Sequence, residues 1–236
     1  MPDLVVVEHT VSNLHVATLA AKLEYEVEFN LTIVDNSCDE EWRRRIKSWV
    51  DRMVVNFPEL NLRLLCLSEN VGYGRGNNVI IEKSQSKYHL VINPDLFSEP
   101  DSLCKALAFM ELNSDVGLLS PSVYSEDGVQ QFLCKNNPTL LIMFLRGFVD
   151  QLGIFPFRSV VERYELKDMN YDEVIDGLQY PSGCFMFFRT EYLQKIKGFD
   201  PDYFLHYEDA DIGRRMLQIA RVVYVPSVKV VHIGAH

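Results

Sequence analysis

The chain has 236 residues, 47% apolar and 24% charged, which is ordinary for a soluble globular protein with one sizeable core. Its formal net charge of −10 argues against nucleic-acid binding, because such proteins need lysine and arginine to replace the counterions around phosphate. The five cysteines are widely spaced, without a CxxC pair or a secretory segment before them, which favours a reducing cytoplasm. The most apolar run, residues 140–145, is far shorter than the ~20 residues of a membrane-spanning helix.

Short β-branched runs alternate with longer mixed stretches over the first 120 residues. LVVVE, FNLTIVD and LRLLCLS predict strands, separated by a helix up to Tyr25 and by a helix rich in Arg and Trp. YHLVINPD and DVGLLSP continue this pattern after helices predicted near residues 76–86 and 100–113. The alternation indicates an α/β fold with a mostly parallel, Rossmann-like central sheet flanked by helices.

The pattern becomes less regular after about residue 120. CFMFFR predicts a strand, a short helix follows from Thr190 to Gly198, and VVYVPSVKVVHIG predicts a final strand. We interpret this half as an elaboration of the same sheet, so that residues 1–236 form a single domain.

Ligands of such sheets bind beyond the carboxyl ends of the strands. The residues at these ends are therefore candidates for binding: Glu8, His9, Asp35, residues 68–70 and residues 93–95. Asp35 closes the strand in TIVDNS and could accept a hydrogen bond from a base or ribose, although a turn or helix cap explains Asp-Asn-Ser better when it is taken alone.

The stretch SENVGYGRGNN has glycines at 72, 74 and 76 that would let the backbone approach a diphosphate, with Arg75 facing the phosphates. It matches neither a Walker loop nor a dinucleotide fingerprint, and a flexible loop is an equal alternative. In INPD, Asp95 could bind a divalent cation through hard oxygen, helped by His232 after the last strand. A simple turn is the alternative for INPD.

The stretch HYEDADIGRR carries three acids in four positions at the start of a predicted helix. Helix-dipole stabilisation and an Asp211–Arg215 pair could explain this composition without catalysis. The aromatic residues before it favour a second interpretation, in which a carboxylate beside apolar groups and other acids has a raised pKa and acts as a general base. Asp209 is the candidate.

In chain order these stretches resemble family 2 glycosyltransferases, and within them the bacterial rhamnosyltransferase-like branch. The resemblance covers nearly the whole chain and rests on DNS at 35–37, NVGYGRGNN at 70–78, NPD at 93–95, SGCFM at 182–186, GFDPDYF at 198–204, EDAD at 208–211 and a last strand ending in His232.

The resemblance implies a GT-A fold and an inverting, metal-dependent transfer from a nucleoside-diphosphate sugar. The acceptor would be a saccharide or lipid-linked saccharide in the synthesis of bacterial cell-surface polysaccharide such as O-antigen. L-rhamnose from dTDP-rhamnose is the first choice of donor, with a UDP-linked galactofuranose or hexosamine behind it. Residues 1–120 would bind the nucleotide sugar, and residues 121–236 would hold the acceptor and the catalytic group.

Together with the strand-end argument, the resemblance implies a role for each candidate. Asp209 would be the catalytic base, and Asp95 and His232 would hold Mg²⁺ or Mn²⁺. The donor would contact Glu8, Asp35, Asn70, Gly72, Arg75, Asn77, Asn93, Ser182 and Gly183. The pocket would be shaped by Glu208, Asp211 and Arg215.

Two positions depart from the family pattern. Asn93 replaces the first acid of the metal motif, so metal affinity without the donor is expected to be weak, and residues 8–10 replace the usual Thr-Tyr-Asn-like turn. Asn93 favours an alternative, a non-catalytic nucleotide-sugar-binding homologue, which the intact Glu208-Asp209 pair disfavours. Nucleotidyl transfer is a further alternative, but its glycine-rich basic loop after the first strand is missing.

The apolar stretch at residues 136–157 lies where the acceptor is expected to approach. It favours a core helix followed by a proline-bounded loop. The alternative is a flap that meets a lipid-linked acceptor, which would make the enzyme peripheral to the inner membrane face.

Overall fold

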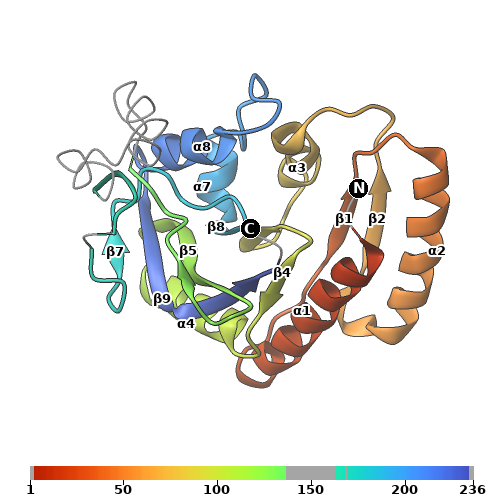
Figure 1. Ribbon diagram of the computed structural model, residues 1–236, viewed down its shortest axis with the longest axis horizontal. Helices are drawn as coiled ribbons and strands as arrows, with labels where there is room; N and C mark the ends of the chain where they lie inside the picture. The colour runs from red at the N-terminus through yellow and green to blue at the C-terminus, as the bar shows by residue number, and fades with distance from the viewer. Residues whose placement is uncertain (1–2, 137–162, 168, 234–236) are drawn as a thin grey trace.

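The computed structural model describes residues 3–136, 163–167 and 169–233 (Figure 1). The first part of the chain contains α1 (Leu4–Glu24), β1 (Thr32–Asp35), α2 (Glu40–Asn56), the 3₁₀ helix η1 (Pro58–Leu60), β2 (Arg63–Cys66), α3 (Tyr73–Ile81), β3 (Tyr88–Ile92), β4 (Leu96–Ser98), α4 (Ser102–Leu112), β5 (Val116–Ser125) and β6 (Gln130–Gln131). The second part contains β7 (Ile175–Asp176), β8 (Phe185–Arg189), α7 (Thr190–Lys195), α8 (Glu208–Met216) and β9 (Arg221–His232).

The described strands form two sheets. β1 and β2 make a small parallel sheet, and the larger sheet has the order β3-β8-β5-β9-β4, with β6 and β7 added beside β5 and β9. The predicted α/β fold with a central sheet and flanking helices is confirmed. The strand directions are more mixed than expected: β5 and β9 are parallel, whereas β8 runs against both β3 and β5. Because strands from before and after residue 120 alternate in this sheet, the two halves of the sequence share it.

Strand β8 has buried side chains on both faces of the larger sheet. Phe185 and Phe187 pack with α4 and the end of α1, whereas Met186 and Phe188 pack with α3, α7 and α8. Successive side chains of a strand point to opposite faces, so the continuous apolar run CFMFFR predicts burial on both sides. This arrangement brings the start of α8 to the same face as α3.

The N-terminal segment is a helix, so the prediction of a strand over LVVVE is wrong. Helix α1 begins after Asp3, whose side chain accepts a hydrogen bond from the backbone N–H of Val5 at 2.9 Å. Its buried positions recur every three or four residues, at Val7, Val11, Leu14, Thr18 and Ala21, with Thr10 and Ala17 beside them. This helical period outweighs the strand preference of three valines, because burial against α2 and α4 overrides local propensity.

Glu8 therefore does not end a strand. Its Oε2 atom accepts a hydrogen bond from the indole N–H of Trp49 at 3.0 Å and ties α1 to α2. The strand-end argument that placed Glu8 at the nucleotide does not hold in this fold.

Among the described helices, α1 alone is long and apolar enough to cross a bilayer, judged by length and composition. A core helix passes the same test, and one side of α1 packs into the protein core. This feature assigns no location to the protein.

A pair of valine substitutions tests the helical N-terminus. Val5 is 60% exposed and Val7 is 5% exposed, although two residues apart in a strand would share one face. We expect Val7→Ala to cost about 1.5 kcal/mol, because two buried methyl groups are worth ~0.8 kcal/mol each. Val5→Ala should change stability by less than about 0.5 kcal/mol. Urea unfolding of both variants measures this, and equal losses would contradict the helix.

Candidate active site

Asp209 is the second residue of α8, and backbone groups hold its carboxylate in place. Its Oδ2 atom accepts a hydrogen bond from the N–H of Gly183 at 3.2 Å, and Oδ1 accepts one from the N–H of Ala210 at 2.9 Å. The Cβ atom that alanine would add at residue 183 would lie 3.0 Å from Oδ2. Glycine is thus what allows the Ser182–Cys184 backbone to approach the carboxylate this closely.

The environment of Asp209 suits a proton acceptor. Burial raises the pKa of its carboxyl above the usual value, and the charge of Glu208 raises it further, while the backbone N–H groups of Ala210, Asp209 and Gly183 lower it. Glu208 is itself only 8% exposed, and its Oε2 atom has no hydrogen-bond partner. Two adjacent carboxyl groups are therefore partly withdrawn from water at the start of α8.

The Ser182–Cys184 segment connects this base to the strand-end candidates. The carbonyl of Cys184 accepts a hydrogen bond from the N–H of Asn93 at 2.9 Å. The Ser182 hydroxyl lies 3.0 Å from the sulfur of Cys184, and burial raises the pKa of that thiol to about 12, so it remains protonated. The segment thus links Asp209 to the loop that carries Asp95.

Asp95 and His232 lie side by side, as predicted for a metal pair, although they are 137 residues apart in the sequence. The distance between Asp95 Oδ2 and His232 Nε2 is 3.4 Å, and the N–H of Ile233 donates to the carbonyl of Asp95 at 3.0 Å. The Oδ1 atom of Asp95 and the Nδ1 atom of His232 are buried and lack hydrogen-bond partners. The hydroxyl of Thr10 fixes the same turn by donating to the carbonyl of Pro94 at 2.7 Å.

A carboxylate oxygen beside an imidazole is a donor set that divalent cations accept. Two ligands are too few for a closed protein site, and no group of three or more His, Cys, Asp or Glu residues suited to a metal is found within the described ranges. The residues present fit a cation that takes its remaining ligands from a bound diphosphate and water.

The glycine-rich stretch packs against its own chain. Gly72 has a φ of +84°, and a Cβ atom there would collide with the carbonyl oxygen of Phe204. A Cβ atom at Gly74 would lie 2.9 Å from the Cβ of Phe199. The group that approaches the backbone at Gly72 and Gly74 is thus the segment between α7 and α8, and the approach of a diphosphate to this stretch stays a prediction.

Polar contacts reinforce this packing. The Asn78 amide donates to the carbonyl of Phe199 at 2.7 Å and accepts from its N–H at 2.9 Å, and Arg75 Nε donates to the carbonyl of Pro201 at 2.7 Å. The start of α3 therefore holds in place the chain segment that leads to Asp209.

Asp35 lies at the end of β1 and is only 3% exposed. Its Oδ1 atom accepts a hydrogen bond from the N–H of Ser37, and its Oδ2 atom lies 3.8 Å from Arg43 Nε. The next residue, Asn36, bonds the glycine-rich loop through Val71 N–H at 2.9 Å and Gly72 C=O at 3.0 Å. The turn interpretation of Asp-Asn-Ser thus describes its local contacts, and it joins the end of β1 to the loop after β2.

The remaining donor-side candidates differ in what they offer a ligand. Asn70 and Arg75 are exposed. Asn70 accepts from the N–H of Gly72 at 3.1 Å, and Asn77 donates to the carbonyl of Tyr73 within α3 at 3.0 Å.

Asp211 and Arg215 form the predicted i,i+4 ion pair, with a distance of 2.6 Å between Oδ2 and Nη2. Arg215 also donates to the carbonyls of Ile196 and Gly198 at 2.8 Å. These contacts anchor α8 to the end of α7, so in this structure the pair holds α8, and with it Asp209, in place.

Two tyrosines beside Asp209 were not predicted from the sequence. The hydroxyl of Tyr73 donates to the carbonyl of Gly183 at 3.1 Å, and the phenol of Tyr180 lies near enough to Asp209 to be affected by its charge. Burial raises the pKa of both phenols, so both remain donors. Nothing in the local sequence of either residue indicates these contacts, since both partners are brought by the fold.

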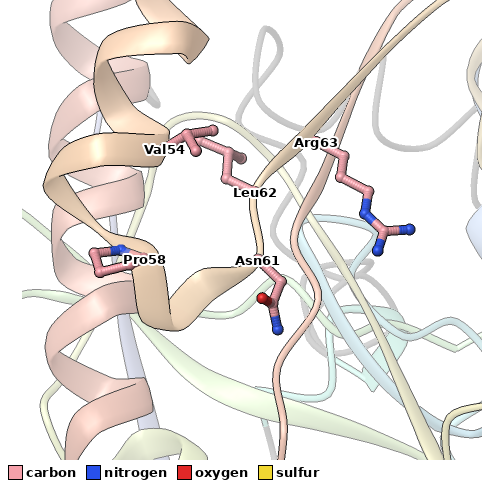
Figure 2. Close-up of a pocket in the computed structure, with 5 residues that line it drawn as sticks. All are labelled: Val54, Pro58, Asn61, Leu62 and Arg63. Carbon is pink, nitrogen blue, oxygen red and sulfur yellow. The ribbon is translucent and has the colours of Figure 1, made fainter.

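One cavity, of about 310 Å³, lies at the amino end of β2, away from this cluster (Figure 2). It is lined by Val54, Pro58, Asn61, Leu62 and Arg63. It contains none of the candidate residues. The apolar stretch at 137–157 lies outside the described residues.

Comparison with known proteins shows what this arrangement is. The Pyrobaculum calidifontis mannosyltransferase PcManGT, solved with GDP-Man and Mn²⁺, aligns with 98% of this chain and 53% of its own at a TM-score of 0.62 and 16% identity. Staphylococcus aureus TarS with UDP-GlcNAc aligns with 98% of this chain and 56% of its own at a TM-score of 0.57 and 18% identity. The fold is therefore that of the GT-A glycosyltransferases.

The sequence comparisons narrow this class. The model of the family "Glycosyl transferase family 2" matches residues 14–197, so the chain belongs to that family. It is 29% identical over 196 residues to the Mycobacterium tuberculosis N-acetylglucosaminyl-diphospho-decaprenol L-rhamnosyltransferase, covering 78% of this chain. It is 24% identical over 178 residues to the rhamnosyltransferase WbbL of Escherichia coli K12, covering 70% of this chain. In both cases the match spans 62% of the relative's length.

A pair of glycine substitutions tests the contact between α3 and the approach to Asp209. Gly72 and Gly128 both have positive φ, but a Cβ atom at Gly128 would meet nothing within 4 Å. Gly128→Ala should therefore cost only the left-handed penalty of about 1–2 kcal/mol. Gly72→Ala should cost about 1–3 kcal/mol more, because the new methyl group strikes backbone. Urea unfolding gives both values, and equal costs would contradict the packing described here.

Proposed function

We propose that this protein is an inverting, metal-dependent glycosyltransferase. It transfers a sugar from a nucleoside diphosphate to a saccharide or lipid-linked saccharide acceptor in bacterial cell-surface polysaccharide synthesis. The observation that carries the proposal is the partly buried Asp209 carboxylate beside Glu208, which is held by Gly183 and joined through the Ser182–Cys184 segment to the Asp95–His232 pair.

In this proposal Asp209 removes the proton from an acceptor hydroxyl as that oxygen attacks the anomeric carbon. The bond to the nucleoside diphosphate breaks on the opposite face, so a single displacement inverts the configuration. Burial raises the pKa of the Asp209 carboxyl, which makes its carboxylate a stronger base than that of a solvated aspartate. The hydrogen bonds from Gly183 and Ala210 orient the carboxylate before the acceptor arrives.

Asp95 and His232 would hold Mg²⁺ or Mn²⁺ through the carboxylate oxygens and one imidazole nitrogen. The bound cation supplies Lewis-acid stabilisation of the departing diphosphate. Support comes from the unpartnered buried atoms of this pair, and from PcManGT having been solved with Mn²⁺. Asn93 at the first position of the motif leaves the pair one acid short, so we expect donor and cation to bind together.

The donor nucleotide would lie along the ends of β1 and β2. Arg75 and Asn70 are exposed and would meet phosphate or base at the surface, whereas Asp35 is buried and would need its turn to open. Ser182, Gly183 and Asn93 would line the sugar. We favour L-rhamnose from dTDP-rhamnose because two curated relatives are named as rhamnosyltransferases, with UDP-linked galactofuranose or hexosamine as the alternative.

A second candidate is a non-catalytic nucleotide-sugar-binding homologue, and Asn93 is the observation that favours it. The two candidates make different predictions for nucleoside diphosphate release. A transferase releases it faster when acceptor is added, whereas a binding protein releases none.

The first experiment replaces the proposed base. Asp209→Asn should lower the rate of sugar transfer by about 10²–10⁴-fold, the usual contribution of a positioned base, while donor affinity stays within about twofold. The control is Asp202→Asn, an exposed acid before α8 that should keep wild-type rates. Turnover is measured as nucleoside diphosphate release, and affinity by calorimetry. Near-normal turnover of Asp209→Asn would remove Asp209 from the mechanism.

The second experiment tests the shared binding of donor and cation. A ligand that binds only the folded state raises the melting temperature, so dTDP- and UDP-sugars are compared with and without Mn²⁺. We expect the largest increase with nucleotide sugar and Mn²⁺ together, and little with Mn²⁺ alone. Asp95→Asn should remove the additional increase in melting temperature due to Mn²⁺. The control is Asp101→Asn, since wild-type Asp101 pairs with Lys105 on the surface, and it should keep that increase. An undiminished increase in Asp95→Asn would exclude Asp95 as a ligand.

A further inference from the structure

Tyr73 is the first residue of α3, directly after Gly72 with its φ of +84°, and it belongs to the glycine-rich segment. Its hydroxyl donates to the carbonyl of Gly183 at 3.1 Å, across 110 positions of sequence. Gly183 in turn donates its N–H to Asp209 Oδ2 at 3.2 Å. One residue therefore receives a hydrogen bond from the glycine-rich segment and gives one to the carboxylate.

The Tyr73 ring is fixed independently of its hydroxyl. It packs edge-on against Phe199, with ring centroids 5.8 Å apart, and its backbone N–H donates to the carbonyl of Phe204 at 3.1 Å. The hydroxyl thus emerges from a well-anchored ring. If the start of α3 shifts, the hydrogen bond of this hydroxyl transmits the shift to Gly183, whereas the ring contacts Phe199.

Few other groups restrain the Gly183 peptide. The Asn93 N–H holds the neighbouring carbonyl of Cys184, and the Ser182 hydroxyl accepts from the N–H of Cys184 at 3.4 Å. The second bond acts on the peptide unit that contains the Gly183 carbonyl, because the Cys184 N–H lies in the same plane, but at 3.4 Å it is longer than the 3.1 Å bond from Tyr73. Because a methyl group at residue 183 would already crowd Asp209, a small shift of this residue changes the hydrogen bond to the carboxylate.

We propose that the Tyr73 hydroxyl is a positioning group, which aligns the Asp209 carboxylate through Gly183 and couples the glycine-rich segment to the base. The inference rests on the proposed function, because it assigns Tyr73 a role in presenting the base for transfer. Tyr73 touches no reacting atom in this arrangement. Its effect passes through a single intermediate residue.

Through these two hydrogen bonds, the glycine-rich segment that would bind the donor and the Asp209 carboxylate would move together. The same segment that would contact the nucleotide through Asn70 and Arg75 carries Tyr73, so a nucleotide that orders this segment also orders Gly183. The base would then be aligned when the donor is bound. This order limits proton abstraction in the absence of a donor.

The test compares Tyr73→Phe with Tyr88→Phe. The first keeps the ring contact with Phe199 and removes only the hydroxyl. The second also removes a hydrogen-bonded tyrosine hydroxyl, the one that donates to Glu111 at 3.0 Å, at the end of β3 opposite to Asn93. Melting temperatures establish that both variants fold.

The first measurement is the titration of the Asp209 carboxyl by ¹³C NMR, assigned by its loss in Asp209→Asn. A hydrogen bond to the ionised form lowers the pKa of a carboxyl, so loosening the Gly183 bond should shift the Asp209 titration to higher pH. The titratable groups that face Asp209 are Glu208, Tyr73, Tyr180 and Cys134. Tyr88→Phe leaves them all in place and should titrate like wild type.

The second measurement is kinetic. Tyr73→Phe should lower kcat by about tenfold, as expected for a misaligned base, with an unchanged Kd for dTDP or UDP by calorimetry. Tyr88→Phe should retain the wild-type kcat. An unshifted Asp209 titration overturns the inference, as does an unchanged kcat or an equal effect of Tyr88→Phe. If the wild-type protein transfers no sugar from any donor, the proposed function fails, and the NMR titration alone decides whether Tyr73 acts on Asp209.

Discussion

The hydrogen bond from Gly183 to Asp209 is the interaction on which the rest of the site depends. It requires residue 183 to lack a side chain, and it requires α8 to begin beside the turn that precedes β8. The same turn binds the Asn93 loop and receives the Tyr73 hydroxyl. Three segments that are distant in sequence are thus held by one short stretch of backbone, and their relative positions define the candidate active site.

Glycines and backbone carbonyl groups form many of the contacts in this arrangement. Gly72 and Gly74 let α3 lie against the segment before α8, where any larger residue would strike Phe204 or Phe199. Asn78 and Arg75 then bond the carbonyls of the same segment. Close backbone packing of this kind leaves little freedom for the segment before Asp209, which favours a base whose orientation is set before the acceptor binds.

The electrostatics of the site oppose stability. Burial raises the pKa of the Asp209 carboxyl, so the folded state binds its proton more tightly than the unfolded chain does. The free energy of unfolding therefore falls as pH rises from the unfolded-state pKa of Asp209 through its folded-state pKa. Glu208 lies beside Asp209 with an unpartnered Oε2, and Asp95 Oδ1 and His232 Nδ1 are likewise buried without a hydrogen-bond partner. Unsatisfied buried groups are costly, and a bound substrate or cation would offset that cost at these three atoms.

After residue 25, the sequence by itself indicated most of the local elements and the residue types at the strand ends. The apolar runs before Arg189 and His232 predict β8 and β9, and the acids after Tyr207 predict the start of α8, because burial on both faces and helix-end charge leave direct traces in the chain. Only the tertiary structure decided that residues 4–8 are helical, since their valines suit either element until α2 and α4 provide a surface. It also decided that Tyr73 reaches Gly183, because a hydrogen bond spanning 110 positions depends on how the chain packs and has no local signature.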